Sequence, residues 1–337
     1  MERIDPRILL VAGAACLSVS AIFVSLSGVS AGTAALFRCA LALPVLLPLF
    51  LWERRRSERG RRHGADLLAG LLLGADLVLW GASITLVGAG IATVLVNVQV
   101  IVLPLLALAA FGERPSRRFV LAVPIMLGGV ALAGGLAGAG AGGTDPARGL
   151  LYGAGAGVMY AGYLFLTRLA GRDGGRRFSP VFMSTLTAGA VSVVIGVPWN
   201  GVDLTPGWAP FGWLAALAMS GQVCGWLLIG AGLSRVRAET GGTLLLLQPI
   251  LAVLFGVVLL GERPTPWQIA GCALVVAAVR LTGGRRRTRS PALPRPPATA
   301  PATAPANVSA NVPDQPRAGS PASTAESTTS VSRPRLR

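Results

Sequence analysis

The sequence is poor in charge and contains no lysine. Charged residues make up 13% of its 337 residues, about half the share typical of soluble domains, whereas 53% are apolar and the mean hydropathy is +0.63. This composition excludes an ordinary soluble enzyme and a disordered protein, and it indicates a protein of the lipid bilayer. All 30 basic residues are Arg. We attribute this exclusive use of Arg to genomic base composition and not to nucleic-acid binding, because phosphate binding would not exclude Lys.

The sequence also has few of the residues that metal sites and catalytic centres need. The one histidine, His63, lies in an Arg-rich segment, and the four cysteines all lie inside apolar runs without metal-ligand spacing. The chain has no Asp-x-x-Asp pair and no candidate for a Ser/His/Asp triad. We therefore expect no metal, no cofactor and no enzymatic activity. A membrane-embedded lipid enzyme is the least favoured alternative.

Ten mostly apolar runs are long enough to cross a bilayer, which takes about 20 residues. Short charged or Gly/Pro-rich connections separate them. The expected spans are 8–27, 32–52, 66–86, 89–111, 118–137, 148–168, 180–199, 210–230, 241–260 and 265–282. The predicted fold is an all-α integral membrane protein with ten transmembrane helices.

The distribution of Arg predicts how the chain is oriented in the membrane. If the N-terminus is cytoplasmic, the loops that face inward carry fifteen Arg, and the outward loops carry only Arg148 and Arg263. Short cytoplasmic loops are the ones that accumulate positive charge. We therefore expect a multi-pass protein of the cytoplasmic membrane with both termini in the cytoplasm.

A short internal repeat divides the ten spans into two halves. The tetrapeptide Gly112-Glu113-Arg114-Pro115 recurs as Gly261-Glu262-Arg263-Pro264, at an offset of 149 residues, and at the same offset Gln99 falls on Gln248. Because each half has five spans, the second half must enter the membrane upside down. Inverted repeats are a design of secondary transporters. The expected domains are a first five-helix repeat at 1–137, a second, inverted one at 148–282, and a disordered cytoplasmic tail rich in Pro, Ala, Thr and Arg at 283–337.

This arrangement resembles the drug/metabolite transporter superfamily, and within it the EamA-type exporters. The resemblance is strongest over 88–135 and 238–282, where each tetrapeptide is followed by a Gly-bearing helix, and Arg38 matches an arginine that such proteins often carry in the second helix. The resemblance implies export of a small, amino-acid-like metabolite or a drug by alternating access, with protons as the coupling ion. A channel or an importer of small solutes is the alternative.

Two ionisable residues inside the spans are candidates for proton coupling or substrate binding. Asp76 lies ten residues into the third span, about 15 Å deep at 1.5 Å per residue, and Trp80 follows on the same helix face. An ionisable group there costs at least about 2.5 kcal/mol and needs a reason. Asp76 is a proton or substrate site, or else a structural residue bonded to a neighbouring helix. For Arg38, structural pairing with Asp76 is favoured over binding of an anionic substrate group.

Polar and aromatic residues near the middle of other spans are candidates for a substrate pocket. The candidates are Trp80, Asn97, Gln99, Tyr160, Gln222, Trp226 and Gln248. Because two residues are about 200° apart on a helix, Asn97 and Gln99 are expected on different faces, with only one of them lining the path.

The two tetrapeptides are expected to be structural. Glu113 and Glu262 close their apolar runs, and we expect each to fix a helix-to-helix turn, with Arg114 and Arg263 as candidate partners. The expected partners of the whole protein are a small-molecule substrate, protons and membrane lipids, with no nucleic acid. The oligomeric state stays open, a homodimer included.

Overall fold

The computed structural model describes residues 4–56, 63–87, 89–134, 145–172, 176–196, 201–261 and 263–282. Glu262 and the segment 283–337, which the sequence predicts to be a disordered tail, lie outside these ranges. Within them the chain is helical and contains no β-strand. The expectation of an all-α protein is therefore confirmed for the described part of the chain.

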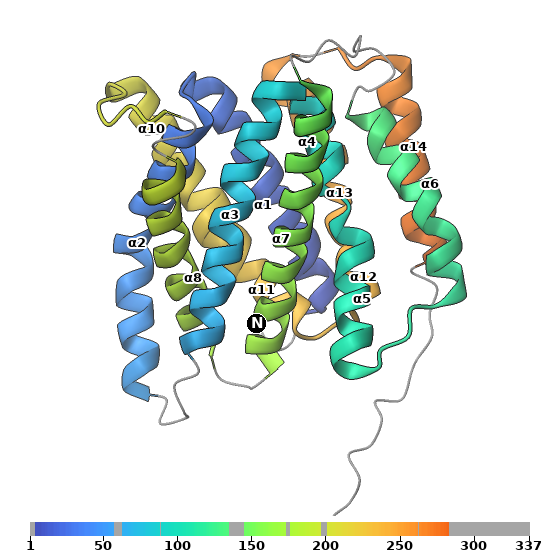
Figure 1. Ribbon diagram of the computed structural model, residues 1–337, viewed down its shortest axis with the longest axis horizontal. Helices are drawn as coiled ribbons and strands as arrows, with labels where there is room; N and C mark the ends of the chain where they lie inside the picture. The colour runs from blue at the N-terminus through green and yellow to red at the C-terminus, as the bar shows by residue number, and fades with distance from the viewer. Residues whose placement is uncertain are drawn as a thin grey trace, which may run out of the picture. The chain divides into compact units, whose positions relative to one another are not determined.

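The helices run side by side along one common direction (Figure 1). They are α1 (Pro6–Ser27), α2 (Ala31–Arg56), α3 (His63–Val87), α4 (Ala89–Val96), α5 (Gln99–Phe111), α6 (Arg117–Ala133), α7 (Pro146–Arg172), α8 (Phe178–Val191), α10 (Trp208–Leu217), α11 (Trp226–Leu233), α12 (Ala238–Leu245), α13 (Leu247–Leu260) and α14 (Pro266–Thr282). Two π-helical segments, η1 (Ser192–Gly196) and η2 (Ala218–Gly225), continue α8 and α10.

Eight helical segments of the described chain are long and apolar enough to cross a membrane. They include Ile91–Phe111, which α4 and α5 share, and Ala238–Leu259, which α12 and α13 share. The expected fifth and tenth spans correspond to α6 and α14. Each has only 17 residues, the lower limit for a spanning helix, so the structure supports a multi-span protein but leaves the number ten as a prediction.

The fourth and ninth expected spans are interrupted at matching positions. α4 ends at Val96 and α5 begins at Gln99, while α12 ends at Leu245 and α13 begins at Leu247. Further along, Gly112 and Gly261 end α5 and α13 with φ of 65° and 67°. This left-handed conformation favours Gly because a Cβ would clash there. Both copies of the tetrapeptide thus begin with the same helix-ending turn.

Buried charges join distant segments near the ends of α2, α5 and α7, which lie at the lower end of Figure 1. We call this the arginine-rich end, and its described arginines are Arg54, Arg55, Arg56, Arg114, Arg117, Arg118, Arg168, Arg172, Arg176, Arg177, Arg235 and Arg237. Arg168 is 1% exposed, and its Nη2 donates to both carboxylate oxygens of Glu113, at 2.9 and 3.0 Å, and to the carbonyl of Val236 at 2.9 Å. Glu113 therefore secures its turn through Arg168 and not through Arg114, whose carbonyl accepts from Arg237 at 2.7 Å. Sequence spacing did not reveal this partner because it lies 55 residues away.

Other contacts at this end also link residues far apart in the sequence. Both carboxylate oxygens of Glu53 on α2 accept backbone N–H groups at the start of α8, from Phe178 and Ser179 among others. Such groups have no partner within their own helix, so a carboxylate there stabilises the helix start. Asp66 on α3 forms an ion pair with Arg176 just before α8.

The helices α6 and α14 pack closely against each other, backbone to backbone. A methyl group on Gly271 would lie 2.3 Å from the backbone nitrogen of Ala133 and 2.6 Å from the carbonyl oxygen of Gly129. Neither atom belongs to a side chain that can turn away. Only glycine allows the two backbones to approach in this way.

We expect Gly271→Ala to lower the thermal stability of the purified protein in detergent. The added methyl forces α6 and α14 apart, at about 1–3 kcal/mol for an overpacked contact. Gly128→Ala on α6 is the matched control, because a methyl there meets nothing within 4 Å, and helix propensity favours Ala by about 1 kcal/mol. Equal melting temperatures for the two variants would contradict the close contact.

Candidate functional site

A cavity of about 260 Å³ lies among the helices and gathers most of the candidate pocket residues. Those that line it are Arg38, Asp76, Trp80, Asn97, Gln99, Tyr160, Trp226 and Gln248. They come from α2, α3, α5, α7, α11 and α13 and from the break between α4 and α5. We call this the central cavity. That these residues share one cavity is a finding, whereas their part in transport stays a prediction.

Asp76 presents an unsatisfied acceptor at the cavity wall. Its side chain is 7% exposed, and its Oδ1 has no hydrogen-bond partner in the described part of the chain. A buried carboxylate oxygen without a donor is costly and marks a functional site more often than a structural one. Asp76 was expected to be either a proton or substrate site or a structural residue bonded to a neighbouring helix. Its Oδ1 forms no such structural bond among the described residues.

The expected pairing of Arg38 with Asp76 is absent from the described structure. Arg38 instead donates through Nε to the side-chain oxygen of Gln222 at 3.0 Å. A guanidinium has five N–H donors, so this one bond leaves its other nitrogens available in the cavity that Arg38 lines. Among the described residues, Arg38 and Asp76 thus line the same cavity without a direct contact, and Gln222, 184 residues further along the chain, gives Arg38 a neutral partner.

Gln222 lies behind the cavity wall and not in it. It is 1% exposed, and its side-chain oxygen accepts from Arg38 and, at 3.2 Å, from Nε1 of Trp226, while its Nε2 donates to the hydroxyl of Thr185 at 2.9 Å. One amide thereby fixes a guanidinium and an indole that both line the cavity. Gln222 belongs to η2, and such π-helical segments are frequent at functional sites.

The two glutamines related by the repeat differ in their bonding. Gln248 donates through Nε2 to the Tyr160 hydroxyl at 3.3 Å, and its backbone carbonyl accepts from the Ser18 hydroxyl at 2.9 Å. Gln99 is 1% exposed, and its side-chain oxygen has no partner among the described residues. The cavity therefore has a second unsatisfied acceptor besides Asp76.

Asn97 and Gln99 both line the central cavity, contrary to the expectation that only one would. The 200° separation holds only within a continuous helix, and the chain leaves the α-helix between Val96 and Gln99. The side chain of Asn97 bonds back to the carbonyl of Thr93 at 2.7 Å. Such a side-chain bond to the backbone competes with regular helix geometry.

Sequence reasoning missed several residues of the cavity wall. Ser18 and Ser20 on α1 are both buried and line the cavity. Serines are ordinary components of membrane helices because they bond to the backbone of their own helix, as both do here, to Ala14 and Leu17. Their only signal was two hydroxyls two residues apart in an apolar span, which is too weak to single out a site.

The chain matches known transporters over most of its length. The model of the EamA-like transporter family matches twice, over residues 7–135 and 147–284. The threonine/homoserine exporter RhtA of Salmonella typhimurium (strain LT2) is 31% identical over 255 residues, which are 74% of this chain and 81% of that protein. RhtA of Escherichia coli (strain K12) is 30% identical over 245 residues, or 72% and 78% of the two chains.

A solved crystal structure shares the fold. It is 18% identical to this chain and matches with a TM-score of 0.71 over 82% of this chain and 98% of its own. The match to the family model confirms the resemblance that the tetrapeptides indicated. The chain belongs to the EamA-like transporter family, within the drug/metabolite transporter superfamily, and is a multi-pass membrane protein.

Proposed function

We propose that this protein is a secondary active exporter of a small amino-acid-like metabolite, working by alternating access and coupled to protons. The observation that carries the proposal is that one cavity holds groups of opposite charge. Arg38 supplies a guanidinium, and Asp76 supplies a carboxylate oxygen without a donor. The relatives named threonine/homoserine exporters support the same substrate class.

A zwitterionic amino acid fits this arrangement of charges. Its carboxylate would bind the Arg38 nitrogens that Gln222 leaves available, since guanidinium and carboxylate match in geometry. Its ammonium group brings three N–H donors, and Asp76 Oδ1 and Gln99 Oε1 are two acceptors that lack donors in the described structure. The substrate would thus satisfy groups that the protein leaves unsatisfied.

The size of the cavity favours a small metabolite over a drug. Pockets for drug-sized ligands have volumes of about 300–1,000 Å³, whereas the central cavity has about 260 Å³. Its aromatic wall, Tyr160 and Trp226 with ring centroids 6.0 Å apart, would pack against the aliphatic part of the substrate.

Alternating access is supported by the position of the cavity along the helices. On α3 the lining residues run from Leu73 to Trp80, whereas the ion pair of Asp66 lies at the arginine-rich end. If that end is cytoplasmic, as the Arg distribution predicts, the structure is closed toward the cytoplasm. Rocking of two inverted five-helix repeats, ten spans in all, would open it. The matched helix breaks before Gln99 and Gln248 support such a repeat.

Proton coupling would follow from competition at one oxygen. An ionised Asp76 binds an ammonium group, whereas a protonated carboxyl group carries no charge to hold it. Proton and substrate would therefore exclude each other from the same site. The protein would carry a substrate in one direction and a proton in the other, which is the exchange that an exporter driven by the proton gradient needs.

We expect Asp76→Asn to abolish proton-coupled export while the protein still inserts and folds. The amide keeps the size of the side chain and can still accept a hydrogen bond, but it neither ionises nor offers a negative charge to an ammonium group. Threonine export would be measured in cells and in vesicles with an imposed pH gradient. Asp203→Asn, at an exposed site away from the cavity, is the control and should export normally. A pH-dependent flux in Asp76→Asn equal to that of the wild type would remove Asp76 from the mechanism.

The inverted topology predicts opposite accessibility for the two tetrapeptides. In a variant whose four cysteines are replaced by Ala, Arg263→Cys should react with a membrane-impermeant maleimide in intact cells. Arg114→Cys should react only after permeabilisation. Both positions are exposed, so access to the reagent depends on the side of the membrane. Labelling of both positions from the same side would overturn the inverted repeat.

A further inference from the structure

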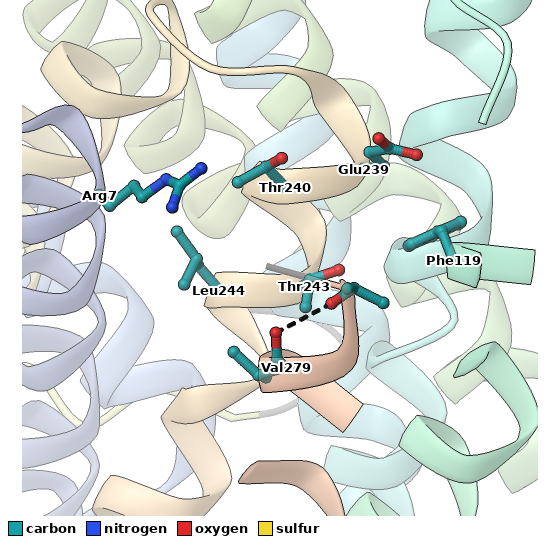
Figure 2. Close-up of a pocket in the computed structure, with 8 residues that line it drawn as sticks. Arg7, Phe119, Glu239, Thr240, Thr243, Leu244 and Val279 are labelled. Carbon is teal, nitrogen blue, oxygen red and sulfur yellow. Dashed lines mark hydrogen bonds between the residues drawn. The ribbon is translucent and has the colours of Figure 1, made fainter. Parts of the chain in front are cut away.

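A second, smaller pocket lies at the arginine-rich end and is separate from the central cavity. It has about 40 Å³ of free space between the starts of α1, α6 and α12 and the end of α14. Figure 2 shows Arg7 reaching from α1 toward Thr240 on α12, with Glu239 and Phe119 on the opposite side. Thr243, Leu244, Val279 and Thr282 complete the lining.

One side chain of this pocket has no hydrogen-bond partner among the residues that the structure describes. Thr243 is 3% exposed, and its hydroxyl oxygen forms no hydrogen bond within the described part of the chain. The hydroxyl of Thr282, in contrast, bonds to the carbonyls of Ala278 and Val279. The dashed line in Figure 2 marks the bond to Val279. A buried hydroxyl without a partner is unfavourable unless something else bonds to it.

The helix that carries Thr243 also borders the residues of the central cavity. A methyl group on the adjacent Gly242 would lie 3.8 Å from the side-chain oxygen of Gln99 and 3.6 Å from Cα of Val100. Thus α12 presents Gly242 to α5 and Thr243 to the small pocket. It stands between the two spaces, and the helix break at Leu246 lies three residues further on.

We propose that the small pocket captures the ammonium group of an amino acid at the cytoplasmic side, before the substrate reaches the central cavity. The proposal rests on the proposed function. Glu239, Thr240 and Thr243 offer one carboxylate and two hydroxyl oxygens, which match the three N–H donors of an ammonium group. The exposed Arg7 lies opposite and would bind the carboxylate.

The size of the pocket fits the ammonium group alone, with the rest of the amino acid outside the pocket. A single water needs about 10–15 Å³ of such space, so 40 Å³ holds a few water-sized groups. That is room for an ammonium group and its neighbouring carbon but not for a whole amino acid. The rest of the substrate would stay at the mouth of the pocket beside Arg7.

Capture would also loosen the closed end, because Glu239 is one of its links. Its Oε2 accepts the backbone N–H of Ser116 at 2.7 Å, and its Oε1 pairs with Arg237 at 3.3 Å. Ser116 caps the start of α6, so the first bond ties α12 to α6. An ammonium group bound to Glu239 competes with both contacts, and α12 gains freedom to move away from Gln99.

The test is threonine transport in vesicles of phosphatidylcholine and phosphatidylglycerol, with substrate supplied at the cytoplasmic face. We expect Thr243→Val to raise KM about 2- to 10-fold, the effect of losing one neutral hydrogen bond, and to leave the melting temperature unchanged or higher. Thr187→Val is the matched control, since that hydroxyl bonds to Met183 on its own helix and lines neither space. Its KM should equal that of the wild type.

A second variant tests the charge. Glu239→Gln keeps an acceptor for Ser116 but not the negative charge, and we expect KM at the cytoplasmic face to rise at least about 10-fold, as for a hydrogen bond to a charged group. The change should be smaller for threonine supplied at the outer face, where Glu239 acts only as a link of the closed end.

Several results would overturn the proposal. An unchanged KM in both variants would mean that the pocket is not a binding site. A Thr243→Val effect that appears only when phosphatidylethanolamine is added would assign the pocket to a lipid headgroup. If Asp76→Asn abolishes export while Thr243→Val and Glu239→Gln behave as the wild type, the capture site fails and the proposed function stands. If the wild type moves no amino acid, both proposals fail.

Discussion

Hydrocarbon offers no hydrogen-bond partners, so each polar group inside a membrane protein must find one within the chain or be kept for a ligand. Most buried polar groups of this chain obey the first condition. Gln222 is fully enclosed yet bonds to Arg38, Thr185 and Trp226, and Glu53 bonds to the start of α8. The unsatisfied oxygens of Asp76, Gln99 and Thr243 stand out against that background. Two of them line the central cavity and the third lines the small pocket beside it.

The helix breaks are the second consequence of the same constraint. A break frees backbone groups that lipid cannot satisfy, so it is tolerated only inside the protein or beside a polar space. Here the breaks precede Gln99 and Gln248, which both line the central cavity. They also let Asn97 and Gln99 face the same space. Polar side chains and irregular backbone therefore occur together for one physical reason.

Much of this could be predicted from the sequence because the cost of burying polar groups makes them conspicuous. Asp76, Arg38 and the two repeated glutamines were found as exceptions in apolar spans. Partners could not be found in the same way, because they depend on packing between distant segments. Nothing in the sequence links Arg38 to Gln222, or Arg168 to Glu113. The serines of α1 escaped notice because a hydroxyl that bonds to its own helix is inexpensive in lipid.

The repeat in the backbone is not matched by a repeat in the chemistry. The two tetrapeptides share their left-handed glycine turn, but the first is held by Arg168. At the repeat offsets of 149 and 146 residues before Arg168, the first half has no arginine but Val19 and Ile22. Among the described residues at the opposite end, the contacts between distant segments include two neutral ones, Ser30 with the carbonyl of Gly201 and the N–H of Asp203 with Thr33. Charged contacts are generally stronger than neutral ones when partly buried. The described contacts at the arginine-rich end are therefore the stronger ones. In the exporter that we propose, this end would be the firmer one, and substrate binding there would have to supply the free energy that opens it.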